Sequence, residues 1–76
     1  MSGLQKRSVV VSGHATSVSL EQEFWAELNA AARRRNVSLN TLVSTIDKGR
    51  DGNLSSALRL FVLAEIRSGN AAQPQP

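Results

Sequence analysis

The chain has 76 residues, which is room for one domain, and it carries nine Lys plus Arg against six Asp plus Glu. It has no cysteine, so neither disulfides nor a thiolate zinc site can stabilise this domain. The lone His14 cannot bind a metal by itself, so no cofactor is expected, and oligomerisation remains the usual stabiliser of so small a domain. No apolar run approaches the roughly 20 residues that span a bilayer, so we expect a cytoplasmic protein without membrane contact, whose net charge of +3 suits an anionic partner.

The two ends of the chain differ from its centre. Residues 1–6 show no periodic pattern, and residues 69–76 are small and polar and contain proline. Such composition is typical of segments that cannot bury enough apolar surface to become ordered. The sequence therefore predicts a flexible N-terminus over 1–6, one domain over 7–68 and a disordered tail over 69–76.

The first element, residues 7–20, alternates apolar and polar side chains as a half-exposed strand does. Val9 and Val11 have one parity, whereas Val18 and Leu20 have the other. A bulge at Gly13 would cause this change, and so would two separate strands. The stretch 16–20 is the cleaner strand, and we predict one strand per chain from it.

The second element is an amphipathic helix of about four turns. Ser19 and Gln22 have the spacing of a capping box, and apolar residues then recur at helical spacing until Asn36 interrupts the pattern. Phe24 and Trp25 lie next to each other near the start of this helix, and we expect them to pack in the core instead of stacking on bases. Arg33–Arg35 at its end favour a solvated helix terminus over a phosphate-binding patch.

Two more helices follow. Ser38 can cap the first, in which Leu39, Leu42, Val43 and Ile46 recur at helical spacing before Gly49. Asn53 or Ser55 can cap the last, whose apolar residues between Ala57 and Ile66 reach almost all the way round. A monomer of this size has too little protein to cover such a helix, which favours a dimer or a larger assembly.

A single strand among three helices leaves backbone groups unpaired on both of its edges. The same strand of a second copy can pair with it across a two-fold axis. We therefore predict a mainly α fold: an intertwined homodimer with an intermolecular antiparallel two-stranded ribbon and a third, C-terminal helix. The predicted dimer core consists of Val18, Leu20, Phe24, Trp25, Leu28, Leu42, Val43, Ile46, Leu58, Phe61 and Val62.

The order strand, helix, turn, helix resembles the ribbon-helix-helix superfamily, and more narrowly its short stand-alone bacterial members. The resemblance covers about residues 6–66 and rests on Lys6-Arg7-Ser8-Val9, Gly13-His14, Thr16 through Glu21, Phe24-Trp25, Ile46-Asp47 and Asn53 through Arg59. It implies an obligate dimer whose ribbon enters the DNA major groove, phosphates bound at the start of the second helix, and a role as a transcriptional regulator.

On this reading the outward ribbon residues Ala15, Ser17 and Ser19 contact bases. The predicted phosphate contacts are Lys6, Arg7, Ser38, Asn40, Lys48 and Arg50, of which Ser38 and Asn40 also have the positive end of a helix dipole in their favour. The superfamily often has a long basic or amide side chain where this chain has Ala15, so base discrimination should be poor. Whether two dimers join is left open.

Catalysis is not predicted. His14 has no companion residue to tune it, and Glu21, Glu23 and Glu27 have no evident cleft in which to act as paired carboxylates. The alternative to DNA binding is a protein-interaction or oligomerisation module of the same fold, which the modest net charge and Ala15 favour. An antitoxin-like role is a narrower version, but the tail from Gly69 is short and lacks apolar anchors.

Overall fold

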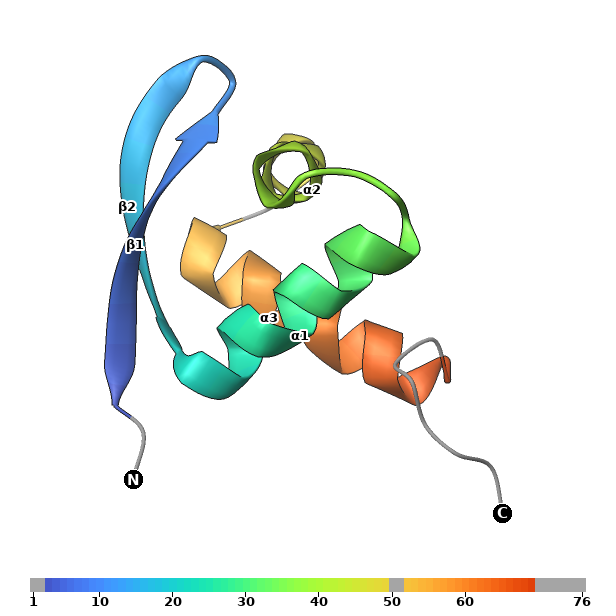
Figure 1. Cartoon of the computed structure of the whole chain (residues 1–76). Helices are drawn as coiled ribbons and strands as arrows, with labels where there is room; N and C mark the ends of the chain where they lie inside the picture. Colours follow the sequence, from blue (N-terminus) through green and yellow to red (C-terminus); the bar gives the residue numbers. More distant parts are fainter. Residues whose placement is uncertain (1–2, 50–51, 70–76) are drawn as a thin grey trace.

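The structure, a computed structural model, describes residues 3–49 and 52–69 (Figure 1). Two strands, β1 (Leu4–Val11) and β2 (His14–Glu21), precede three helices, α1 (Gln22–Arg34), α2 (Leu39–Lys48) and α3 (Leu54–Arg67). The strands form one antiparallel sheet that lies along one side of the helices. Strand, helix and helix therefore follow in the predicted order, with an additional strand in front.

The prediction of one strand per chain is wrong, because β2 already pairs with β1 of the same chain. Ser12 and Gly13 form the connection, with φ of 52° and 81°, the positive values that a tight two-residue hairpin turn requires. Across this two-residue turn, odd-numbered positions of β1 pair with even-numbered positions of β2. The buried side chains of Val9 and Val18 therefore lie on the same face of the hairpin. The change of parity near Gly13 thus marks two strands, and β1 begins at Leu4, inside the segment expected to be flexible.

The predicted helices form, although one cap differs. Ser19 lies in β2 and caps nothing, whereas Glu21 is the N-cap of α1 by backbone conformation without a side-chain cap bond. At the other end Asn36 adopts a φ of 60°, and the Val37 N–H donates to the Ala32 carbonyl, which is the closing bond of a Schellman motif. Asparagine suits this position because its side chain tolerates the left-handed region.

The two later helices have side-chain caps. Ser38 Oγ accepts a hydrogen bond from the Thr41 N–H at 3.0 Å, as predicted for α2. Asn53 Oδ1 accepts one from the Ser56 N–H at 2.8 Å, so Asn53 is the residue that caps α3, and Ser55 lies within the helix. Both bonds satisfy a donor that the first turn of a helix leaves free.

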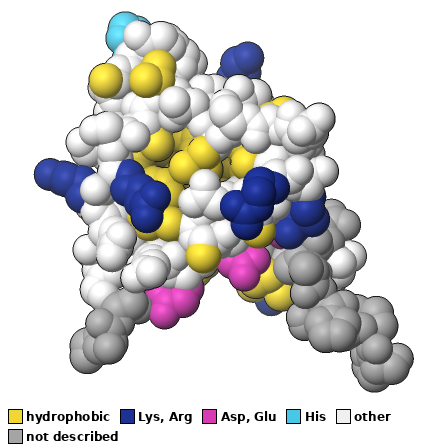
Figure 2. All heavy atoms as spheres, in the orientation of Figure 1, with side chains coloured by type: hydrophobic (Ala, Val, Ile, Leu, Met, Phe, Trp, Pro, Cys, Tyr) yellow, Lys and Arg dark blue, Asp and Glu magenta, His cyan; other side chains and the backbone are white. Residues whose placement is uncertain are grey.

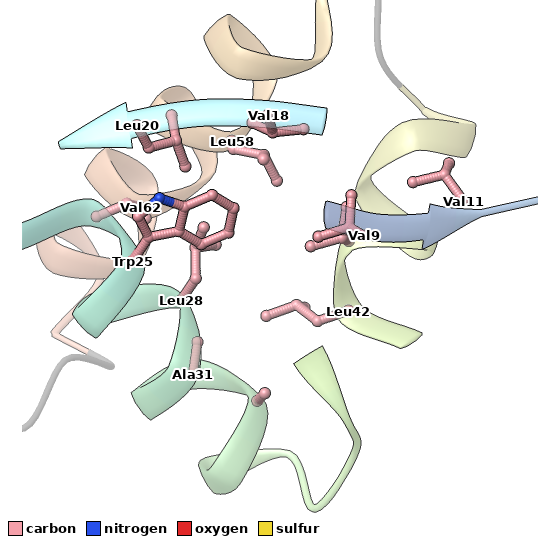
Figure 3. Packing of buried hydrophobic residues seen from close by; sticks show 12 residues of the cluster. Val9, Val11, Val18, Leu20, Trp25, Leu28, Ala31, Leu42, Leu58 and Val62 are labelled. Atoms are coloured by element: carbon pink, nitrogen blue, oxygen red, sulfur yellow. The ribbon is translucent and has the colours of Figure 1, made fainter. Parts of the chain in front are cut away.

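The core closes within one chain. Figure 3 shows Val18 and Leu20 of the hairpin near the Trp25 indole, which lies among Leu28, Leu58 and Val62 from the helices. Trp25 is 1% exposed, and its Nε1–H donates to the Gln5 carbonyl at 2.9 Å. Of the residues predicted for a dimer core, most are buried here without a second copy, and Phe24, Ile46 and Phe61 are partly buried against them.

The arginines at the end of α1 join α1 to α3. Arg34 Nη2 lies 3.0 Å from Glu65 Oε1, and Arg35 Nη2 lies 2.5 Å from Glu65 Oε2, while the Arg35 guanidinium carbon is 5.2 Å from the centre of the Phe61 ring. The hydrogen bond from Arg35, with help from Arg34, lowers the pKa of Glu65 to about 2. The interpretation of this terminus as merely solvated is therefore wrong for Arg34 and Arg35.

Candidate nucleic-acid interface

The outward face of the hairpin carries the residues predicted to contact bases. In the register of the sheet, Lys6 is opposite Ser19, Ser8 is opposite Ser17 and Val10 is opposite Ala15. These pairs alternate with pairs that contain the buried Val9 and Val18, so they point away from the helices. Ala15, Ser17 and Ser19 thus form one row, as predicted, and Lys6 and Ser8 stand beside it on β1.

Lys6 and Arg7 lie on opposite faces of the hairpin. Lys6 shares the outward face with the serine row, whereas the Arg7 guanidinium carbon is 5.4 Å from the centre of the Trp25 ring, on the face toward α1. Among the described residues Lys6 is the one cation in a sheet position on the outward face. The structure therefore does not bring these two predicted phosphate contacts together.

The start of α2 holds the hairpin at Val10. The Val10 N–H donates to Asn40 Oδ1, and the Val10 carbonyl accepts from Ser44 Oγ, each at 3.2 Å. Both backbone groups of Val10 therefore point toward α2 and away from β2. Asn40, a predicted phosphate contact, uses its oxygen for this bond, and its side-chain N–H groups remain able to donate elsewhere.

The hydrogen bonds of Val10 with α2 also show which backbone groups of β2 point away from β1. Peptide groups of an antiparallel pair alternate between the partner strand and the outside. Because Val10 points outward and lies opposite Ala15, the N–H and C=O groups of Ala15, Ser17 and Ser19 also point away from the partner strand. In the part of the chain that the structure describes, the sheet has no third strand beside this edge.

A shallow groove of about 580 Å³ lies between the hairpin turn and α2. Donor-bearing side chains line much of it: Ser12, Asn40, Thr41, Ser44, Thr45 and Lys48. Ser38 lies at the start of the same helix, where its Oγ caps Thr41. The predicted contacts Ser38, Asn40 and Lys48 therefore belong to one helix beside the hairpin, and Arg50 lies outside the described residues.

The charge around this surface is dispersed. Figure 2 shows Lys and Arg side chains spread over one face, around apolar atoms between the hairpin and the helices. A surface of this kind offers hydrogen bonds from small side chains with moderate electrostatic attraction.

Among residues 3–49 and 52–69, no group of three His, Cys, Asp or Glu side chains is arranged to hold a metal ion. None of the helices in these ranges has the length and apolar character of a membrane span.

Sequence reasoning missed Ser8 and Ser44. Ser8 faces outward opposite Ser17, and Ser44 helps to fix the hairpin on α2. The alternation of Lys6, Ser8 and Val10 with the more buried Val9 and Val11 was a usable signal for Ser8, once β1 is read as a strand of its own. No local pattern marks Ser44, because its partner Val10 is 34 residues away.

Comparison with known proteins gives one family and one structure. A family described as "Ribbon-helix-helix domain" matches residues 4–66. An uncharacterized protein from Bordetella pertussis Tohama I has a similar structure, with a TM-score of 0.73 and 30% sequence identity over 95% of this chain. This chain spans 63% of the length of that protein. No curated protein matches the sequence.

Proposed function

Because this chain belongs to the ribbon-helix-helix family, whose domains typically form dimers and bind DNA, we propose that it is a DNA-binding transcriptional regulator whose ribbon lies in the major groove. The observation that carries the proposal is the outward row of Ala15, Ser17 and Ser19 with Lys6 beside it. Small polar side chains leave room for a ribbon to approach base edges closely, and a lysine at its border meets the phosphates.

The working unit is a homodimer in which the outer edges of two β2 strands pair about a two-fold axis. The peptide groups of Ala15, Ser17 and Ser19 point away from β1 and have no partner strand among the described residues, which supports this arrangement, since an exposed edge of this kind is a template for another strand. The sheet then has the order β1, β2, β2, β1, instead of the two-stranded ribbon predicted from sequence. Its two central strands present the serine rows of both copies together.

The width of the DNA major groove gives the inner and outer strands of the proposed four-stranded sheet different roles. The major groove is about 12 Å wide. Two central strands about 5 Å apart fit inside it, whereas the outer strands, about 14 Å apart, reach its walls. Ala15, Ser17 and Ser19 therefore meet bases with little discrimination, and Lys6 meets phosphates.

The helices and Arg7 supply the remaining phosphate contacts. Asn40 and Lys48 on α2 line the groove beside the hairpin, and Ser38 is the N-cap of the same helix, so these side chains can reach the flanking phosphates of the DNA. Arg7 can join them by leaving the ring of Trp25. Affinity in this arrangement comes mostly from the phosphate backbone and depends strongly on salt.

A titration of fluorescent random-sequence duplex DNA at several salt concentrations tests this function. Wild-type protein should bind in the micromolar range and weaken steeply with salt. Lys6→Ala should reduce the salt slope by about one for each Lys6 in the complex. Arg33→Ala, which removes an exposed cation at the end of α1 that is not among the proposed phosphate contacts, serves as the matched control. An unchanged slope for Lys6→Ala would show that this side chain does not contact phosphate.

Absence of DNA binding at low salt by folded dimeric protein would overturn the proposal. The protein-interaction module would then be the better interpretation, with the paired β2 edges serving dimerisation alone.

A further inference from the structure

Two hydrogen bonds join the hairpin to α2 through a single residue of β1. The Val10 N–H donates to Asn40 Oδ1, and the Val10 carbonyl accepts from Ser44 Oγ. Asn40 and Ser44 are four residues apart on α2, so they lie on one face of the helix. At this point of the sheet edge, side chains of α2 thus take the place that a neighbouring strand would have. The two bonds are here named the Val10 clamp.

The Val10 clamp acts next to the row that is proposed to meet bases. Val10 lies opposite Ala15 in the register of the hairpin, so the clamped residue is the cross-strand neighbour of the first residue of the row. The helix that holds Val10 also carries the proposed phosphate contacts Asn40 and Lys48. Figure 1 shows α2 beside the turn end of the hairpin, with α1 and α3 nearer its open end. The clamp therefore links the base-facing part of the molecule to its phosphate-facing part.

Apolar packing by itself leaves the angle between the hairpin and α2 poorly fixed, because the hydrophobic effect has no preferred direction. Val9 and Val11 are buried and hold β1 against the helices in this way. Hydrogen bonds are directional, so a donor and an acceptor on one residue fix both the position and the tilt of the turn end. We propose that Ser44, together with Asn40, is a positioning residue for DNA binding, which holds the hairpin at the angle at which the ribbon and α2 contact one duplex together.

The contribution of Ser44 to affinity is indirect. Its hydroxyl hydrogen is used by the Val10 carbonyl, and Ser44 is not among the proposed phosphate contacts. A hairpin released from α2 has to be ordered again when both parts meet the DNA, and this ordering weakens binding. The inference rests on the proposed function, because the angle matters only where both parts contact DNA.

Ser44→Ala in the full chain tests the inference with two readouts. Hydrogen exchange of the Val10 N–H in the free protein, followed by NMR, should be faster than in wild type, because the turn end separates from α2 more often. Titration of fluorescent random-sequence duplex DNA, well below the melting temperature and at equal mass by light scattering, should show binding weakened by about three- to tenfold. A residue needed only for stability would change the melting temperature and leave the affinity of the folded protein unchanged.

Two further variants serve as rescue and control. Ser44→Thr keeps the hydroxyl and should restore both the slow exchange at Val10 and the wild-type affinity. Thr45→Ala is the matched control, because Thr45 lines the same groove but its hydroxyl donates to the Thr41 carbonyl of its own helix. Thr45→Ala should behave as wild type in both readouts.

Wild-type affinity in Ser44→Ala overturns the inference and leaves the proposed function intact. Weaker binding without faster exchange at Val10 also overturns it, since Ser44 would then contact DNA directly. Equal weakening by Thr45→Ala or by Ser44→Thr has the same consequence. Absence of DNA binding by the wild-type protein overturns the proposed function and the positioning role with it, and the exchange at Val10 then reports only whether the clamp holds the hairpin.

Discussion

At the scale of single residues, Glu65 is the main polar link between α1 and α3. Its side chain is 9% exposed and accepts hydrogen bonds from Arg34 and Arg35. Charged partners hold the folded pKa at about 2, below the ordinary value of 4.5. A carboxyl with a lowered folded pKa stabilises the protein above its unfolded pKa, and this contribution is lost as the pH falls toward the folded pKa.

Glu65→Gln should lower the free energy of unfolding at pH 7 by about 2 kcal/mol, because two guanidinium groups lose their carboxylate. The difference from wild type should be constant above about pH 5 and should shrink between pH 4.5 and pH 2. Urea denaturation at a series of pH values measures it. Glu27→Gln is a suitable control, since the structure gives Glu27 no ion pair among the described residues. A pH-independent difference would contradict the ion-pair explanation.

At the scale of elements, the hairpin depends on a turn with two positive φ angles. Gly13 adopts such an angle at little cost, whereas Ser12, at a φ of 52°, carries a side chain that disfavours it. Asn-Gly is the preferred pair for this turn. The turn is therefore built from one favourable residue and one that is only tolerated.

Ser12→Asn should raise the free energy of unfolding by about 0.5 kcal/mol, because asparagine tolerates the left-handed region better than serine. Gly13→Ala should lower it by about 1 kcal/mol for the opposite reason. Both values come from chemical denaturation of the same preparation. A destabilising Ser12→Asn combined with a neutral Gly13→Ala would mean that the hairpin turn is built differently.

At the scale of the whole molecule, the proposed dimer depends on one sheet edge. Ser17 and Ser8 lie opposite each other in the hairpin. The backbone groups of Ser17 point to the outer edge of β2, and those of Ser8 point to the outer edge of β1. Proline can replace a residue whose N–H makes no bond within the sheet, and it then blocks further pairing at that edge. The two serines therefore provide a matched pair of positions.

Ser17→Pro should abolish the dimer, and Ser8→Pro should preserve it. For the dimer, the melting temperature should rise with protein concentration, whereas the Ser17→Pro monomer should melt at a constant temperature. Circular dichroism melts between micromolar and hundred-micromolar concentration, with the mass from light scattering, measure both effects. Loss of the dimer in both variants, or in neither, would place the interface elsewhere.

Local patterns in the sequence determined the helices and much of the core. Helical spacing identified the apolar faces of the first two helices, and a nearly continuous apolar run identified the third. Ser38 and Asn36 marked a start and an end, because caps and left-handed residues act within a few positions of the chain. The alternation from Thr16 to Leu20 likewise identified β2 and its outward row. The capping box at Ser19 failed because pairing with β1 keeps Ser19 in the strand up to the start of α1.

Tertiary structure decided which strand pairs with which, and what the arginines do. The parity change near Gly13 fits a bulge as well as a turn, and the backbone bonds between β1 and β2 are what select the turn. Arg34 and Arg35 contact a carboxylate about 30 residues away, and Asn40 contacts Val10 across a similar separation. Local propensity carries no information about such contacts, because they form only when packing brings distant segments together. The sequence by itself thus determined the three helices, β2 and the family resemblance. Tertiary structure decided that β1 is a second strand at one edge of β2, and that no strand of the described residues occupies the other edge.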